Sequence, residues 1–481
     1  PAMSSKVLIT AALPYANGPL HFGHIAGAYL PSDCYARFER MRGADVLYLC
    51  GSDEYGVAIT LAAEQAERSY QEHVDYYHQL NKAFFKQLNL SFDFYSRTTT
   101  EIHTATAQEF FLDLWHNGYI EEKTEKHLYS EEEGRFLADR YVTGICPECG
   151  FASARGDECS RCGASYEATD LKKPLSRLTH SPLVLKPSRH WYLRFDKFRK
   201  PLKDWLKNKK WKSNVLKFAE HYAKNLKPRA ITRDSNWGIP VPLAAAKGKV
   251  LYVWFDAPIG YISIAKEWAL AQKQPDLWEK YWLDPGTKLV QFIGKDNIPF
   301  HTVFFPAMIM GQNKPYKLPD EVPANEFYLL EGRQFSKSDN WFIDLKAFFQ
   351  HFTADQIRYY LAATAPETAD SSFAWAEFQQ RCNSELVGKL GNFVYRCLSF
   401  IKNKGKMVMP AIKDLEQDDK EFLRETTLLV DEAAIAYANF HLRKSCQLLL
   451  EIAQKGNIYF DRKKPWLLIK DPANYQSLQN V

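Results

Sequence analysis

Four of the nine cysteines form two pairs whose spacing suits metal binding. Cys146 and Cys149 make one CxxC pair, nine residues intervene, Cys159 and Cys162 make the second, and a glycine follows each pair. Each pair can form a tight turn that presents two thiolates, and four thiolates complete a closed tetrahedral shell for zinc. Two disulfides or free thiols are the alternatives, and disulfides are disfavoured in a cytosolic chain. The spacing therefore predicts one structural Zn²⁺ with no open position for catalysis.

A second candidate site is the sequence His21-Phe22-Gly23-His24, which follows a short apolar run and a turn-rich stretch. Two imidazoles three residues apart lie on the same side of a helix's first turn, and Gly23 leaves room for a flat base or ribose. The free N–H groups and partial positive charge of a helix N-terminus suit phosphate groups. By itself, the pair is equally consistent with surface histidines that have no function.

A third candidate lies far downstream, in Gln334-Phe335-Ser336-Lys337-Ser338. The surrounding residues are polar, so we expect a loop. A lysine on such a loop can close over a triphosphate and stabilise the charge that develops on departing pyrophosphate. Taken alone, Lys337 is more simply explained as a solvated surface lysine.

The elements that position these residues follow from the hydrophobic pattern. Residues 6–13 and 46–50 are short apolar runs typical of buried parallel strands, and a helix is expected between them from about 23 to 41. Strand, helix and strand form a βαβ unit, which predicts an α/β fold with a doubly wound, Rossmann-like parallel sheet. Further strands are expected at 249–255, 288–293 and 326–330, and helices from about 354 onward. The resulting predicted division is a catalytic α/β domain in two parts (3–120 and 231–350, the second with the Lys337 loop), a zinc-binding insertion (121–230) and an α-helical bundle (351–481).

The histidine motif and the Lys337 loop together resemble the two signatures of class I aminoacyl-tRNA synthetases. Further motifs are similar to those of the methionyl-tRNA synthetase family: Ala11–Gly18 (AALPYANG), Cys50–Gly56 (CGSDEYG), Val253–Tyr261 (VWFDAPIGY) and Gly294–His301 (GKDNIPFH). The spacing of the cysteine pairs agrees as well. These motifs and Trp466 extend over nearly the whole chain in the family's order, so the resemblance is specific to that family.

The resemblance implies a methionine pocket. Asp53 is expected to pair with the ammonium group, assisted by the backbone of Leu13, because a buried ammonium needs a charged partner. Tyr261 O–H and His301 N–H are expected to donate weakly to the thioether sulfur, which also favours aromatic neighbours. The implied pocket residues are Leu13, Tyr15, Trp254, Ala257, Pro258, Tyr261 and His301. Without the resemblance, such an aromatic cluster indicates plain core packing.

The resemblance also implies an ATP site. His21 and His24 are expected to contact the phosphates, Gly23 to lie under the adenosine, and Lys337 to bind pyrophosphate in the transition state. Lys295 with Asp296 is expected to border the nucleotide, and Arg233 is a further phosphate contact. The implied reaction is attack of the methionine carboxylate on the α-phosphate of ATP, with Mg²⁺ on the departing phosphates, followed by transfer of methionine to the 3′ end of tRNA(Met).

The implied tRNA contacts lie in the helical C-terminal region. Asn392 and Arg396 are four residues apart on one helix face, and Trp466 corresponds to the family's stacking tryptophan; all three are expected to bind anticodon bases. Residues 194–229 contain 13 Lys or Arg against three acids, with two interleaved tryptophans. This stretch is equally consistent with a path for the tRNA acceptor arm and with a solvated helical face.

Some positions depart from the family pattern. The loop reads QFSKS where KMSKS is common, so Gln334 replaces a lysine while Lys337 is kept, and we expect retained activity with altered ATP affinity. Phe305 replaces a frequent tryptophan and Asn297 a frequent apolar residue, which leaves the contour of the pocket open. Three alternatives remain: a leucine, isoleucine or valine synthetase, which would carry a larger editing insertion; a nucleotidyltransferase, which would lack the helical region; and a zinc-containing RNA-binding protein without activity.

Composition is that of an ordinary globular protein. Hydrophobic residues make up 46% of the 481 residues, and the formal net charge is +5, so any nucleic-acid surface must be a local patch. No apolar run is long enough to span a membrane, and no signal peptide is visible. A cytoplasmic protein is therefore expected.

Overall fold

The computed structural model describes residues 5–156, 159–164, 166–336, 339–404 and 411–481. By contacts between residues, the chain divides into two compact units. Unit 1 comprises residues 1–19, 44–84 and 92–323, and unit 2 comprises residues 20–43, 85–91 and 324–481.

Unit 1 is built on a parallel sheet with the strand order β13-β1-β2-β3. The strands are β1 (Lys6–Ala11), β2 (Asp45–Ser52), β3 (Phe94–Arg97) and β13 (Lys288–Gly294). Val7 is in register with Lys288 on one side and with Val46 on the other. The predicted strands at 6–13, 46–50 and 288–293 are thus confirmed, because continuous apolar runs are buried on both faces of a parallel sheet.

The helices of unit 1 that matter for the site are α3 (Val57–Gln65), α5 (Glu101–His116), α8 (Val253–Asp256) and α9 (Gly260–Ala271). Helix α9 packs against β2 and β3. The predicted strand at 249–255 is wrong in its second half: β12 ends at Leu251 and helix α8 begins at Val253. Val253 and Phe255 are buried, and a fully buried helix shows the same unbroken apolar run as a buried strand.

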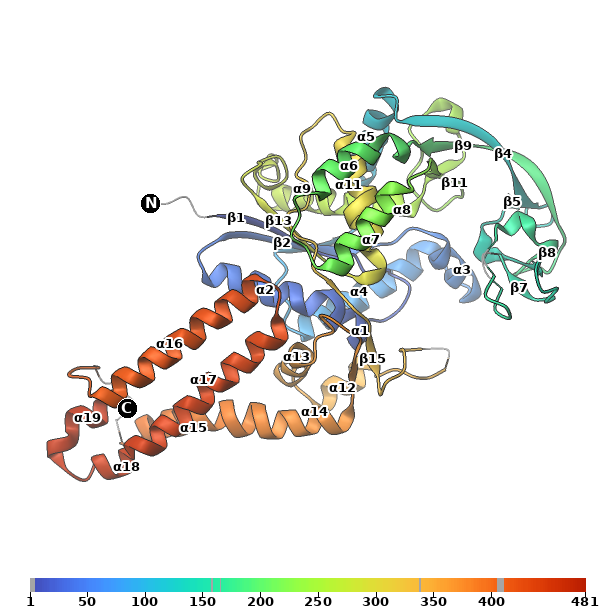
Figure 1. The fold of residues 1–481 in the computed structure, drawn as a ribbon. Helices are drawn as coiled ribbons and strands as arrows, with labels where there is room; N and C mark the ends of the chain where they lie inside the picture. The colour runs from blue at the N-terminus through green and yellow to red at the C-terminus, as the bar shows by residue number, and fades with distance from the viewer. Residues whose placement is uncertain (1–4, 157–158, 165, 337–338, 405–410) are drawn as a thin grey trace. The chain divides into compact units, whose positions relative to one another are not determined.

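A long two-stranded ribbon leaves the sheet region of unit 1. Strand β4 (Ile120–Ser130) pairs antiparallel with β9 (Leu183–Leu193) along its whole length, and both are visible as the curved ribbon in Figure 1. Beyond the ribbon's end lies a small sheet of β6 (Val142–Ile145), β7 (Ala154–Arg155) and β8 (Lys172–Ser176). This small sheet carries the cysteine pairs. Helices α6 (Arg199–Leu206) and α7 (Ser213–Lys224) follow the ribbon and hold much of the basic stretch.

Unit 2 is mainly helical. Its first helix is continuous from Phe22 to Met41, with a π-helical turn at Ile25–Tyr29 followed by α2 (Leu30–Met41), in agreement with the predicted helix. The later elements are β15 (Tyr328–Leu330), α12 (Leu345–His351), α13 (Ala354–Ala363), β16 (Ser371–Phe373), α14 (Trp375–Arg381), a π-helix (Cys382–Gly391), α15 (Asn392–Lys404), α16 (Gln417–Ala438), α17 (Leu442–Lys463), α18 (Pro465–Leu468) and α19 (Tyr475–Asn480).

Two features hold unit 2 together near its first helix. The Phe22 ring is fully buried and lies 5.1 and 5.2 Å, centroid to centroid, from Phe348 and Phe373. Asp33 on α2 is also fully buried and pairs with Arg358 on α13 at 2.6 Å. A buried carboxylate is tolerated because this guanidinium and Ser91 satisfy it.

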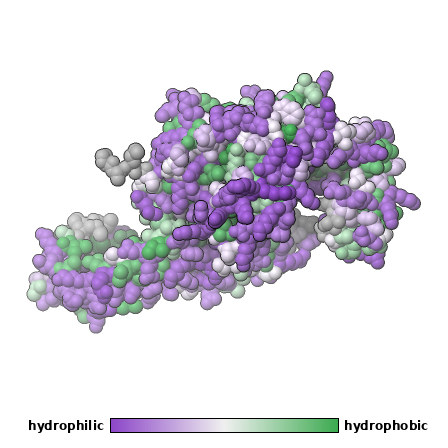
Figure 2. All heavy atoms as spheres, turned by 45° about the horizontal axis from the view of Figure 1, so that its top comes forward, coloured by the Kyte–Doolittle hydropathy of each residue, from purple (hydrophilic) through white to green (hydrophobic). Residues whose placement is uncertain are grey.

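Hydrophilic side chains cover most of the face in Figure 2, with apolar patches over the C-terminal helices.

Candidate active site

Residues predicted to bind methionine lie at the carboxyl ends of β1 and β2. The backbone N–H of Asp53 donates to the Pro14 carbonyl at 2.9 Å, and Ala16 N–H donates to the Asp53 carbonyl at 2.9 Å. These two bonds hold the segment with Leu13 and Tyr15 beside Asp53. Ligands of open α/β sheets bind at this edge, beyond the carboxyl ends of the strands.

Asp53 is 3% exposed, and its Oδ1 atom has no hydrogen-bond partner among the described residues. Burial, and next the negative charge of Asp256, raise the pKa of Asp53 well above its ordinary value. Asp256, at the end of α8, is fully buried and its Oδ1 is likewise unpartnered within the described chain. Two interacting buried carboxyl groups with free oxygens form a site that favours a bound cation.

Asp256 was not among the predicted site residues, although it lies within the quoted VWFDAPIGY motif. Its Oδ2 is 3.0 Å from Nε2 of His103, whose Nδ1 is 2.8 Å from the Ser263 hydroxyl. All three side chains are fully buried. A single histidine in a helical segment gives no signal in the sequence, so only the packing of α5 against α9 reveals this group.

Two aromatic residues of the predicted pocket, Tyr15 and Trp254, lie in one ring cluster with Phe300. Trp254 stacks on Phe300 with ring centroids 4.1 Å apart, and Tyr15 meets Trp254 edge-on at 6.4 Å. Ala257 and Pro258 form the buried 3₁₀ turn that joins α8 to α9. Aromatic rings and small apolar groups of this kind suit a polarisable thioether.

Tyr261 and His301 are hydrogen-bonded to each other, with Oη and Nε2 2.8 Å apart. Nδ1 of His301 lies 3.0 Å from the Asn297 carbonyl, which only accepts, so Nδ1 carries the proton. Burial lowers the pKa of His301 to about 4, although the bond to Asn297 opposes this. The ring is therefore neutral at pH 7, Nε2 accepts, and Tyr261 O–H donates to it.

In this structure, the two groups expected to donate to a sulfur atom form hydrogen bonds with other partners. Each donor is already used, Tyr261 O–H toward His301 and His301 N–H toward Asn297. The two side chains instead present a polarised hydroxyl–imidazole pair to the pocket. Asn297 acts through its backbone, so its polar side chain is not what fixes His301. Phe305 is fully buried, and its ring centroid lies 6.3 Å from that of Tyr261.

Arg233 lies on β11 (Thr232–Asp234), with its guanidinium carbon 3.7 Å from the Tyr252 ring centroid. It borders a cleft of about 310 Å³ that Trp254 and Phe300 also line. The structure thus brings this predicted phosphate contact close to the predicted methionine pocket. Lys295 and Asp296 form a 3₁₀ turn with Asn297, directly after the carboxyl end of β13.

The His21–His24 motif lies in unit 2, where it starts the first helix. Nδ1 of His21 accepts from Gly23 N–H at 3.0 Å, and Nδ1 of His24 accepts from His21 N–H at 3.1 Å, so the two histidines cap the helix. Their rings are 3.8 Å apart. A Cβ on Gly23 would come within 2.8 Å of the His21 ring and 3.1 Å of the Tyr328 carbonyl. Glycine is therefore needed for the histidine arrangement itself.

The loop that carries the predicted catalytic lysine is described up to Ser336 and again from Asp339. Lys337 lies outside the described residues. Ser336 and Trp341 exchange two backbone hydrogen bonds of 2.9 and 2.7 Å, which close the loop's base. The Phe335 ring stacks on His21 with centroids 4.3 Å apart and planes at 7°. Within unit 2, the two predicted signatures are thus in direct contact.

The predicted anticodon residues lie in the C-terminal helices. Asn392 and Arg396, both on α15, contact the side-chain oxygen of Asn457 at 3.2 and 3.4 Å. Arg396 also pairs with Asp461 and lies over the Phe460 ring. Trp466 is 41% exposed, and its ring centroid is 6.1 Å from that of Phe460. The buried residues Asn457 and Phe460 of α17 are therefore the shared neighbours of the three predicted residues.

The four predicted cysteine ligands form one cluster, with all sulfurs within 4.8 Å of one another. The pairs Cys146–Cys162 and Cys149–Cys159 are 3.9 and 3.7 Å apart. These separations are too long for disulfides and match the edge of about 3.8 Å expected for four thiolates around zinc at 2.3 Å. The donor set thus fits a tetrahedral metal ion.

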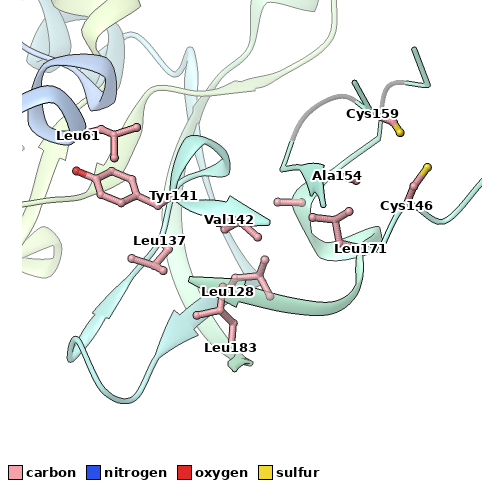
Figure 3. Packing of buried hydrophobic residues seen from close by; sticks show 11 residues of the cluster. Leu61, Leu128, Leu137, Tyr141, Val142, Cys146, Ala154, Cys159, Leu171 and Leu183 are labelled. Carbon is pink, nitrogen blue, oxygen red and sulfur yellow. The ribbon is translucent and has the colours of Figure 1, made fainter. Parts of the chain in front are cut away.

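The cysteine cluster is joined to the rest of unit 1. Cys146 and Cys159 are fully buried at the edge of an apolar cluster that includes Leu61 of α3, as Figure 3 shows. The Tyr141 hydroxyl donates to Thr60, which also lies on α3, at 2.8 Å.

No helix within the described parts of the chain has the length and apolar character needed to cross a membrane.

Comparison with known proteins identifies the family of this chain. The family described as tRNA synthetases class I (M) matches residues 7–398. A methionine–tRNA ligase of Protochlamydia amoebophila is 63% identical over 464 residues, covering 96% of this chain and 66% of that relative. One from Chlamydia caviae is 54% identical over 469 residues, covering 98% and 85%.

The fold of this chain is similar to that of a solved structure. The structure of Mycobacterium tuberculosis methionyl-tRNA synthetase bound by methionyl-adenylate has a TM-score of 0.78 and 24% identity, covering 99% of this chain and 87% of that one. The predicted α/β fold with a helical C-terminal region is confirmed by this likeness. The chain belongs to the methionine type of class I tRNA synthetases, the family of methionine–tRNA ligases.

Proposed function

We propose that this chain activates L-methionine with ATP, forming methionyl-adenylate and pyrophosphate, and transfers methionine to the 3′ end of tRNA(Met). The observation that carries the proposal is the buried, unpartnered Asp53 carboxylate in the same unit as the Tyr261–His301 pair. An amino acid with an ammonium group and a soft, uncharged side chain satisfies both features. The family membership supports this assignment.

The methionine pocket comprises Leu13, Tyr15, Asp53, Trp254, Ala257, Pro258, Tyr261 and His301. Asp53 binds the ammonium group, and the aromatic cluster contacts the thioether. Leucine and isoleucine lack the polarisable sulfur that favours aromatic neighbours, which weakens their binding relative to methionine.

Activation is attack of the methionine carboxylate on the α-phosphate of ATP. The carboxylate is already ionised at neutral pH, so the step needs no general base, and catalysis consists of positioning and charge stabilisation. The groups assigned to ATP are His21, Gly23, His24, Arg233, Lys295, Asp296 and Lys337. A magnesium ion carried by ATP supplies further charge neutralisation on the departing phosphates.

The four-cysteine centre is proposed to hold one structural Zn²⁺ through Cys146, Cys149, Cys159 and Cys162. We also propose the functional division stated from the sequence, with the insertion at 121–230 carrying this ion and residues 351–481 serving tRNA recognition.

The decisive experiment is ATP–pyrophosphate exchange with each of the twenty amino acids, without tRNA. Exchange that depends on methionine alone is expected. Exchange with a different amino acid would mean that the pocket around Trp254 and His301 is misassigned. No exchange with any amino acid would contradict the activation step.

Replacing Lys337 by alanine is expected to slow adenylate formation by about 100-fold or more, because one cation that stabilises transition-state charge is lost. Methionine binding should stay near normal, since no methionine contact is assigned to this loop. Stopped-flow measurement of adenylate formation checks the first part of this prediction, and equilibrium binding of methionine checks the second. Lys346→Ala, an exposed lysine on α12, is the matched control, and equal loss of both functions in Lys337→Ala would refute the role.

Replacing Trp466 by alanine is expected to raise the KM for tRNA(Met) by about 10-fold, which corresponds to the loss of one base-stacking contact. Exchange without tRNA should be unchanged. Aminoacylation kinetics with wild-type tRNA provide the measurement. Tyr475→Ala, exposed in the same C-terminal region, is the control; a similar tRNA defect in both variants would indicate general disturbance of these helices.

A further inference from the structure

A buried chain of three polar side chains adjoins the Asp53 site. Asp256 Oδ2 is 3.0 Å from His103 Nε2, and His103 Nδ1 is 2.8 Å from Ser263 Oγ. Ser263 Oγ is in turn 3.3 Å from the Gly260 carbonyl. None of the three side chains is exposed to solvent. The chain thus connects Asp256 to two helices, α5 and α9, by hydrogen bonds alone.

His103 is well placed to orient Asp256. Its backbone N–H donates to the side chain of Thr100, the residue that caps α5, which fixes His103 in the first turn of that helix. Ser263, in the first turn of α9, holds the other ring nitrogen. Because the backbone of His103 and its ring atom Nδ1 are both held in place, Nε2 points at Oδ2 of Asp256. The other oxygen of Asp256, Oδ1, is left free.

The chain permits two proton arrangements. With Asp256 protonated, its O–H donates to Nε2, Nδ1–H donates to Ser263, and Ser263 O–H donates to the Gly260 carbonyl. With Asp256 ionised, Nε2–H donates to the carboxylate and Ser263 O–H donates to Nδ1. The two arrangements differ by one proton, which leaves for solvent when a cation enters. Either way the imidazole is neutral, since burial lowers the pKa of His103 to about 3.

We propose that His103 is a positioning residue for methionine activation, which holds Asp256 so that Asp53 and Asp256 together face one ammonium group. This inference rests on the proposed function. Asp53 supplies the direct contact, and Asp256 supplies the second negative charge. His103 keeps that second carboxylate hydrogen-bonded in its ionised form, as a bound cation requires.

Other titratable groups surround the two carboxylates and set the background of any pH dependence. They are Glu54 and Tyr55 after β2, Tyr15 after β1, Tyr252 before α8, Tyr261 on α9, His301, Arg97 on β3 and Arg140 from the insertion. Arg97 pairs with Glu54 at 2.7 Å, which offsets that carboxylate's charge. Substitutions at His103 leave all of these groups unchanged.

The test compares His103→Asn with His103→Gln. The two amides have the same chemistry, but a glutamine amide reaches the position of Nε2 and can bond to Asp256, whereas an asparagine amide reaches only that of Nδ1. ATP–pyrophosphate exchange is measured against methionine and ATP concentration from pH 5.5 to 9. Thermal melting of each variant verifies folding, and Thr106→Val, a buried position on the same helix α5, is the control.

His103→Asn is expected to raise the KM for methionine by about 10- to 100-fold with little change in the KM for ATP, as for an unpartnered buried carboxylate. The loss of methionine affinity on acidification should begin at higher pH, because the bond that His103 donates to ionised Asp256 is charge-assisted and stronger than the one it accepts from protonated Asp256. His103→Gln is expected to stay within about threefold of wild type. Ser263→Ala, which removes only the far end of the chain, should shift the methionine KM in the same direction by a smaller factor.

The outcomes separate the two proposals. If wild-type exchange does not depend on methionine, the proposed function fails and this inference fails with it. If the wild type is methionine-dependent but the Asn and Gln variants share one methionine KM and one pH profile, His103 has only a structural role and this inference alone is overturned. If His103→Asn does not fold, the Ser263→Ala and His103→Gln profiles decide, and unchanged methionine KM and pH profile in Ser263→Ala overturn it.

Discussion

Replacing Asp53 by asparagine is expected to lower kcat/KM for methionine by about a thousandfold, the effect of removing one partner of a buried ion pair. The side-chain shape is kept, so the loss isolates the charge. Exchange kinetics with methionine provide the measurement, and the KM for ATP should change little. Retention of more than about a tenth of the wild-type kcat/KM would contradict the assignment of Asp53 to the ammonium group.

The same substitution is expected to stabilise the ligand-free protein. Because burial raises the pKa of Asp53 above its value in the unfolded chain, the folded state binds the proton more tightly, and stability falls as the pH rises from about 4. The asparagine side chain carries no charge, so the Asp53→Asn variant should melt above the wild type at pH 8, by about 2 °C or more. The difference should shrink toward pH 4.

Asp45, at the other end of β2, is the matched control and should behave oppositely. Although its partial burial acts against them, hydrogen bonds from Lys280 and Tyr281 lower the pKa of Asp45. A lowered pKa contributes stability above the unfolded-state pKa, so Asp45→Asn should reduce the melting temperature at neutral pH and leave exchange intact. Equal activity losses in the two variants would point to a general effect on the strand.

Replacing Cys146 by serine is expected to remove the bound metal and unfold the cysteine-bearing sheet. A structural zinc contributes on the order of 10 kcal/mol to a small module, more than such a module's own core can supply. Purified wild-type protein should contain about one zinc per chain, and the variant much less than half of that. Metal analysis together with limited proteolysis, with new cleavage between residues 139 and 182, checks the result.

Cys397→Ser serves as the control for the zinc prediction, because Cys397 lies on α15, outside the cluster. Its zinc content and cleavage pattern should match those of the wild type. A wild-type protein that folds fully without metal would contradict the zinc assignment, whatever the variants do.

What the sequence predicted well is local. The cysteine pairs specify their turns through four-residue segments that need no distant partner, with Gly150 and Gly163 at φ of 73° and 71° completing them. The strands of the parallel sheet were predictable because their burial on both faces leaves continuous apolar runs. The helix predicted from about 23 to 41 is likewise found, from Phe22 to Met41.

The features that the sequence did not predict depend on contacts between distant segments. His103 and Asp256 are 153 positions apart, and neither has a neighbour that signals its partner. The hydrogen bonds of Tyr261 to His301 and of His301 to the Asn297 carbonyl use the donors that each side chain offers when considered alone. Helix α8 was taken for strand because buried apolar segments look the same in both. The resemblance identified the pocket residues, but their hydrogen bonds required the fold.

The stacking of Phe335 on His21 also bears on how tightly the chain holds nucleotide. If ATP phosphates contact His21 as proposed, and the stack must open for that contact, the apparent dissociation constant equals the intrinsic one divided by the open fraction. A ring stack of about 1 kcal/mol leaves roughly one molecule in six open, which weakens apparent affinity about sixfold. On the proposed ATP site, nucleotide affinity would then be set partly by the side chain of Phe335.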